Sequence, residues 1–270
     1  MTGEPLTWHY GVVARWWAEF NTDGPEIAYF RNAVERHGQP ALDVACGTGR
    51  LLLPYLAAGL DADGCDISPD MLALCRARAD REGLSPRLYA QAMHELDLPR
   101  SYRTVFVCGG FGLGGSRRND GEALRRIYAH LDPGGMLVMD NHLPYQNAER
   151  WQYWLRDKRR GLPEPPLPPQ RRRAPDGSEL ALHARVVDFD PLAQVITYQM
   201  HAMQWRDGQL SADEEHTLRE CLYFRNELLM MLGQAGFEDI QVYDGYTEAE
   251  ATGDSDVLVF AARKPGPRRS

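Results

Sequence analysis

Apolar residues recur at helical spacing up to Gly38, and change after it to short strand-like runs. The first predicted helix places its apolar side chains at i, i+3, i+4 and i+7, namely Val13, Trp16, Trp17 and Phe20. Pro25 suits the first position of a second helix, whose end is marked by Gly38. Residues 1–40 are therefore predicted to form an N-terminal helical lid.

Short apolar strands then alternate with helices. Strands are predicted over Ala41–Ala45, Asp61–Asp66, Arg87–Gln91, Arg103–Cys108 and Met136–Asp140. The intervening helices are expected over Arg50–Leu60, from Pro69 with Ser68 as its cap, and from Asn119, where Glu122 completes a capping-box pattern. Asp132-Pro133-Gly134-Gly135 is predicted to be a turn. This alternation is typical of parallel βαβ units with helices on both faces.

The alternation stops after the fifth strand. Residues 158–177 are rich in Pro and Arg and indicate a loop, and 178–224 are strand-like, with turns at Asp190-Pro191 and Asp207-Gly208. A helix over 226–235 and strands over 240–243 and 257–262 follow. We therefore expect an α/β, Rossmann-like, seven-stranded, mostly parallel sheet with a small antiparallel β insertion. The expected parts are a core at 41–145 and 223–264, a linker and cap at 146–222, and a tail at 265–270.

Composition narrows the functional classes. Hydrophobic residues at 43% and charged residues at 25% are globular values, so a disordered chain is excluded. A net charge of −8 argues against nucleic acid as a partner. No apolar run is long enough to span a membrane, and Met1–Glu4 lacks the basic start of a secretory signal. Five cysteines without a CxxC pair argue against a disulfide framework or structural zinc, and favour a cytoplasmic location.

The most informative segment joins the first strand to the next helix. Gly47 and Gly49 let the backbone turn tightly and approach a ligand closely. Asp66 ends the second strand, 17 residues after Gly49, where a carboxylate can accept both hydroxyls of a ribose. A dinucleotide site has a third glycine three residues after the second, and here that position is Leu52. The pattern favours a ligand with a ribose, a base and a smaller zwitterionic arm.

These residues resemble the class I S-adenosylmethionine-dependent methyltransferases. Four strings, in the family's order and at its spacing, carry the resemblance over nearly the whole chain: Asp43-x-Ala45-x-Gly47-x-Gly49, Asp66–Leu72, Leu131–Gly135 and Ala235-Gly236-Phe237. The resemblance implies S-adenosylmethionine as cofactor and S-adenosylhomocysteine as product.

The resemblance also implies roles for individual residues. Asp43 and the backbone at Ala45, Gly47 and Gly49 would hold the methionine arm. Asp66 would bind the ribose, with Ile67 and Met71 beside the adenine. Relatives often carry Gly-Asp-Met after the third strand, but this chain has Gln91-Ala92-Met93, so backbone groups around Ala92 and Met93 are expected to meet the adenine. Cys108 would lie under the sulfonium, and Tyr10 is the candidate lid tyrosine near the methionine arm.

Candidate bases for the methyl acceptor follow the fifth strand. His142 is the first choice, because its ordinary pKa lies near neutrality, and Tyr145 is the second. A magnesium site is not expected, because the fourth strand ends in Cys108-Gly109-Gly110 without a carboxylate. The same segment lacks the Asn/Asp-Pro-Pro-Tyr string of base-modifying methyltransferases.

The inserted β segment is the expected acceptor-binding cap, with Trp151, Tyr153 and Trp154 as lining or packing aromatics. The predicted function is methyl transfer to N or O of a small-molecule acceptor, for example a sugar or another secondary metabolite. Two alternatives stay open: a nicotinamide-dependent oxidoreductase, and a non-catalytic S-adenosylmethionine-binding or assembly protein. A homodimer is compatible with the exposed β segment.

Overall fold

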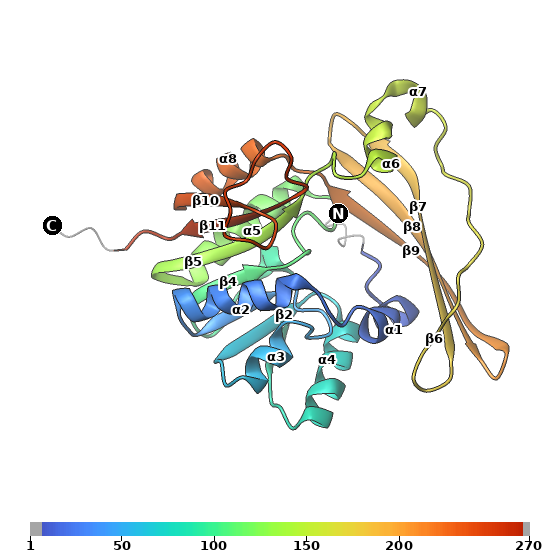
Figure 1. The fold of residues 1–270 in the computed structure, drawn as a ribbon, viewed down its shortest axis with the longest axis horizontal. Coiled ribbons are helices and arrows are strands. Elements are labelled where there is room, and N and C mark those ends of the chain that lie inside the picture. The colour runs from blue at the N-terminus through green and yellow to red at the C-terminus, as the bar shows by residue number, and fades with distance from the viewer. Residues whose placement is uncertain (1–6, 267–270) are drawn as a thin grey trace. The chain divides into compact units, whose positions relative to one another are not determined.

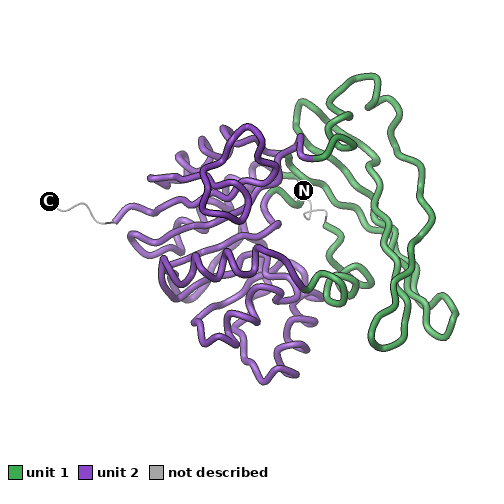
Figure 2. The backbone as a smooth tube through the Cα atoms, in the orientation of Figure 1, with its two compact units in different colours: residues 1–22, 112–116, 147–222 green, residues 23–111, 117–146, 223–270 purple. Residues whose placement is uncertain are grey.

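A computed structural model describes residues 7–266. The chain divides into two compact units, which Figure 2 distinguishes by colour. The sheet unit contains residues 23–111, 117–146 and 223–270, and the cap unit contains residues 1–22, 112–116 and 147–222. The helix after Pro25, expected in the lid, thus belongs to the sheet unit. The predicted tail at 265–270 lies mostly outside the described residues.

The sheet unit is built on seven strands in the order β10-β11-β5-β4-β1-β2-β3 (Figure 1). In that order the bounds are Glu238–Asp244, Val257–Arg263, Leu131–His142, Tyr102–Val107, Ala41–Val44, Ala62–Asp66 and Arg87–Ala90. The five strands from β5 to β3 are parallel, whereas β11 runs antiparallel to both of its neighbours. This arrangement confirms the predicted fold class.

Five main helices accompany the sheet: α2 (Pro25–His37), α3 (Leu52–Ala57), α4 (Pro69–Glu82), α5 (Arg117–His130) and α8 (Arg225–Ala235). Phe30 and Val34 of α2 pack with Tyr55 of α3 against Phe106 and Val138 of the sheet, and all five are buried. Every residue of β1 and β2 is buried too, as expected for central parallel strands. A short 3₁₀ turn, η1 (Met93–Glu95), follows β3.

Local signals set some boundaries and not others. The Ser68 cap is confirmed, since its hydroxyl accepts a hydrogen bond from the Met71 N–H at 3.2 Å. The start predicted at Asn119 is wrong: α5 begins at Arg117, directly after Ser116, itself a favoured capping residue type.

The predicted turn at 132–135 is also wrong, because β5 continues through it. Gly134 takes a positive φ of 79° there and the pairing with β4 shifts, while the Gly134 N–H donates to the Lys264 carbonyl at 2.9 Å. The neighbouring strands supply hydrogen-bond partners that an isolated turn would lack.

The cap unit is a four-stranded antiparallel sheet in the order β6-β7-β8-β9, with bounds Arg172–Arg173, Glu179–Asp190, Val195–Arg206 and Gln209–Cys221. The Asp207-Gly208 hairpin is confirmed: both residues have positive φ, as a type I′ turn requires. Val12 and Val13 of α1 (Gly11–Phe20) pack on Leu180 and Met200. The remaining elements are α6 (Ala148–Trp151), η2 (Gln152–Trp154) and α7 (Arg156–Arg159).

Candidate functional site

The loop after β1 has an unusual backbone. Ala45, Gly47 and Gly49 all have positive φ, at 61°, 54° and 79°. A Cβ on residue 49 would lie 2.6 Å from the Cys75 Sγ, so close packing requires glycine there as well as the dihedral. Ala45 holds its left-handed conformation with a side chain, at a cost of roughly 1–2 kcal/mol. Strain of this kind concentrates at functional sites.

Asp66 ends β2 beside this loop. Its two carboxylate oxygens accept hydrogen bonds from the backbone N–H groups of Gly47, at 2.9 Å, and Ser68, at 2.8 Å. The residue is only 8% exposed. Burial raises the pKa of the Asp66 carboxyl, and the two N–H groups oppose that rise. A carboxylate has about four acceptor positions, and these two hydrogen bonds use two of them.

Asp43 lies within β1 and is fully buried. Burial raises the pKa of its carboxyl well above the ordinary value, the Asp66 charge adds to the rise, and the Arg50 guanidinium opposes it. Two buried carboxyls therefore stand at the ends of adjacent strands. Their charged forms would be stabilised by a cationic ligand.

A third buried carboxyl group lies near the end of β5. Asp140 accepts the Gly109 N–H at 2.6 Å on one oxygen and the Tyr246 hydroxyl at 2.7 Å on the other. Burial raises the pKa of Asp140, against the lowering effect of these hydrogen bonds. Cys108 is half-buried at the end of β4, and burial raises the pKa of its thiol. Tyr246, in the connection from β10 to β11, was not anticipated, because it is 106 residues from Asp140.

Arg50 follows the glycine loop and links it to α2. Its guanidinium forms an ion pair with Glu26, in the first turn of α2, and lies 3.9 Å from the Cys108 Sγ. The sequence analysis did not predict this ion pair, although Arg50 directly follows Gly49 and its place beside the glycine loop made it a candidate site residue. Four acids, Asp43, Asp66, Asp140 and Glu26, accompany Arg50 here, so this set of five described residues is net negative when ionised.

The residues expected near the adenine fall on three segments. Met71 is in the first turn of α4, with its methyl group 3.5 Å from where a Cβ on Gly47 would lie. Ile67, between Asp66 and Ser68, is half-buried. Ala92 is buried just before η1, and Met93 begins it. Met71 therefore meets the glycine loop directly.

The candidate bases are accessible. His142 is the last residue of β5 and is exposed, with its Nδ1 3.1 Å from the Gln146 Oε1. Tyr145 is 42% exposed, and its ring stacks at 6.4 Å on Phe224. Tyr10, by contrast, precedes α1 in the cap unit. Its role beside the methionine arm stays a prediction.

Comparisons with known proteins find methyltransferases. Residues 41–135 match the family of methyltransferase domains. A protein from Geobacillus sp. (strain WCH70) named as a methyltransferase is 24% identical over 266 residues, which cover 94% of this chain and 99% of the relative. An S-adenosylmethionine-dependent methyltransferase structure from Clostridium acetobutylicum aligns with a TM-score of 0.70 at 16% identity, over 93% of this chain and 97% of that one. A sugar N-methyltransferase structure from Streptoalloteichus sp. ATCC 53650 aligns with a TM-score of 0.69 at 19% identity, over 98% and 96%.

The strand order with its antiparallel β11, the glycine loop and the acid ending β2 occur together in one sheet unit. Across residues 7–266, none of the helices has the length and apolar character needed to cross a bilayer. The chain thus carries a methyltransferase domain at residues 41–135, and its fold is that of solved S-adenosylmethionine-dependent methyltransferases.

Proposed function

We propose that this protein transfers a methyl group from S-adenosylmethionine to a nitrogen or oxygen atom of a small-molecule acceptor. The observation that carries the proposal is the Asp66 carboxylate, which is held by the Gly47 and Ser68 N–H groups through two of its roughly four acceptor positions. This is the arrangement that a ribose diol requires.

The residues present fit the cofactor. Asp66 would accept the ribose hydroxyls, and the loop backbone at Gly47 and Gly49 would meet the methionine arm. Ile67, Met71, Ala92 and Met93 would surround the adenine. The net negative cluster of Asp43, Asp66, Asp140, Glu26 and Arg50 favours a cation over a pyrophosphate, which would be repelled. When bound, the sulfonium supplies an activated methyl group and a good leaving group.

The protein's own contribution would be orientation and proton removal. Holding the acceptor in line with the methyl group is worth on the order of 7–11 kcal/mol. We assign His142 as the candidate base and Tyr145 as its alternative, because both are exposed, His142 as the last residue of β5 and Tyr145 three residues after it. A base is needed where the accepting hydroxyl or ammonium group must lose a proton.

We further propose residues 146–222 as the acceptor-binding cap, with an amino sugar as the first acceptor class to test. Supporting this, the likeness to the sugar N-methyltransferase structure covers 98% of the chain, so it includes the cap as well as the core. Aromatic side chains such as Trp154 and Phe189, whose ring centroids lie 5.1 Å apart, give the cap its packed interior.

Calorimetric titration with S-adenosylmethionine, S-adenosylhomocysteine and NADH tests the cofactor. We expect micromolar binding of the first two and none of NADH, whereas the reverse pattern would favour an oxidoreductase. Transfer of a labelled methyl group to a panel of nucleotide-linked amino sugars, free amino sugars and phenols then tests the acceptor. Cofactor binding with no transfer to any acceptor would favour the non-catalytic alternative.

A further inference from the structure

Asp140 is a buried acid that is held on both of its carboxylate oxygens. Both are occupied, one by the Gly109 N–H and one by the Tyr246 hydroxyl, and only 3% of the residue is exposed. A general base has to lie within hydrogen-bond reach of the proton that it takes, and the burial of Asp140 keeps an acceptor away from it. Asp140, which stands two residues before the exposed His142, is therefore unsuited to take a proton from an acceptor.

The Gly109 contact points to a different role. Gly109 follows β4 directly and adopts a positive φ of 64°, so the chain turns sharply there. The next residue, Gly110, is so close to Ala45 that a Cβ on it would lie 2.6 Å from the Ala45 Cβ. The turn at Cys108–Gly110 therefore packs on the glycine loop, and Asp140 holds this turn through a short, charge-assisted hydrogen bond.

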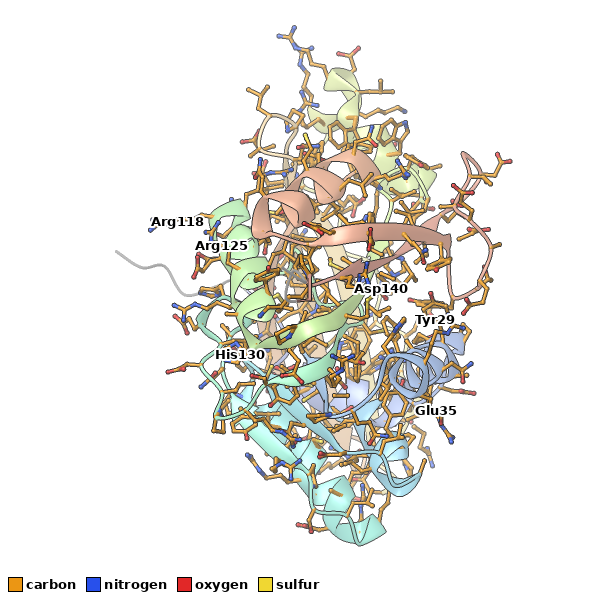
Figure 3. The ribbon with its side chains drawn as sticks, turned by 90° about the vertical axis from the view of Figure 1, so that its left-hand side faces the viewer. Tyr29, Glu35, Arg118, Arg125, His130 and Asp140 are labelled. Carbon is orange, nitrogen blue, oxygen red and sulfur yellow. The ribbon has the colours of Figure 1, made fainter. Side chains whose placement is uncertain are left out.

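Tyr246 in turn holds Asp140. Its ring lies against Tyr29 and Phe30 of α2, at centroid distances of 6.0 and 6.2 Å, so its hydroxyl has little freedom to move. Tyr29 and Asp140 are both labelled in Figure 3. The carboxylate is thereby fixed between the end of β4 and the connection that enters β11.

We propose that Asp140 and Tyr246 are positioning residues for methyl transfer: Tyr246 fixes the Asp140 carboxylate, and Asp140 fixes the Cys108–Gly110 turn against the glycine loop. This inference rests on the proposed function, because the turn is where the donor's sulfonium would lie. Neither residue touches the acceptor.

The surroundings of the carboxylate define how it titrates. Cys108 faces it from β4, Tyr246 from the β10–β11 connection, and His142 acts on it from β5. Glu26 of α2 and Asp140 itself act on Tyr246, whose phenol pKa burial raises, so the hydroxyl stays protonated and able to donate. Removing that hydroxyl deletes one donor to the carboxylate and leaves the ring packing in place.

The test compares Tyr246→Phe with Tyr243→Phe, a matched control on β10 whose hydroxyl donates instead to Gln241. The probes are S-adenosylmethionine binding by calorimetry and the pH titration of the Gly109 amide resonance by NMR. In Tyr246→Phe we expect the Gly109 titration midpoint to rise by about one pH unit, and S-adenosylmethionine binding to weaken about tenfold. Asp140→Asn should abolish the Gly109 titration, and Tyr243→Phe should change neither readout.

The outcomes separate this inference from the proposed function. An unchanged Gly109 titration or unchanged affinity in Tyr246→Phe, with the wild type binding normally, would overturn the positioning role alone. Equal losses in both phenylalanine variants would also overturn it, since they would indicate general loosening of the fold. A wild-type protein that does not bind S-adenosylmethionine would instead remove the proposed function and this inference with it.

Discussion

Replacement of Asp66 by alanine is the most direct perturbation of the proposed cofactor site. Backbone N–H groups take two of the roughly four acceptor positions of this carboxylate, and in the proposed complex a ribose diol would take the other two. Loss of two hydrogen bonds to a charged acceptor should weaken binding by roughly 2–4 kcal/mol. That is about a 30- to 700-fold rise in Kd. Calorimetry with S-adenosylhomocysteine measures it.

The same substitution leaves the buried Gly47 and Ser68 N–H groups without their acceptor. Each unpaired N–H group lowers the stability of the protein by about 1–3 kcal/mol. The substitution also removes a buried carboxyl group, which partly offsets this loss. Thermal unfolding therefore has to confirm that Asp66→Ala is folded at the titration temperature. Asp80→Ala, which removes an exposed carboxylate from α4, is the control and should bind normally. An unchanged affinity in folded Asp66→Ala would mean that the ribose lies elsewhere.

Three further predictions concern charge, packing and the base. Burial raises the pKa of Asp43 and of Asp66 in the free protein, so a bound cation should lower both pKa values and release protons. The affinity for S-adenosylmethionine should therefore rise with pH above the ordinary aspartate range, and more steeply than the affinity for S-adenosylhomocysteine. Calorimetry at several pH values measures this, and an affinity that does not change with pH would contradict it. Gly49→Ala should lower the free energy of unfolding by roughly 2–4 kcal/mol, because the new side chain would need a positive φ and would place its Cβ 2.6 Å from the Cys75 Sγ. Urea denaturation measures this loss, and a loss below about 1 kcal/mol would be inconsistent with that close contact. His142→Ala should reduce methyl transfer by about 10²- to 10⁴-fold at unchanged cofactor affinity, and a turnover near wild type would exclude His142 as the base.

The raised pKa of Asp43 makes the stability of the free protein fall with rising pH, whereas its affinity for the cation should rise. Its folded-state pKa is raised above the unfolded value, so the folded protein binds the proton more tightly. The stability linked to that proton is present at low pH and is lost as the pH rises through the window between the two values. Burying Asp43 thus costs stability at neutral pH, and a bound cation would offset that cost.

The fold was largely predictable because its signals are local. The alternation of apolar runs and helical spacing indicated parallel βαβ units, and the Ser68 cap and the Asp207-Gly208 turn depend on neighbouring atoms only. Two predicted boundaries were wrong. At Asn119 the helix begins earlier, after the alternative cap residue Ser116, and at 132–135 the pairing of adjacent strands outweighed the local turn pattern.

The glycine loop, Asp66 and their place at the ends of adjacent strands follow from the sequence, since parallel βαβ units bring those ends to one edge. The contacts of Tyr246 with Asp140 and of Glu26 with Arg50 arise only when the chain packs in three dimensions. Both contacts depend on chain packing over long sequence distances: β11 enters between β5 and β10 and carries the preceding connection to the end of β5, and α2 packs across the sheet. No local spacing encodes such a meeting, because its partners are chosen by which faces can be buried together.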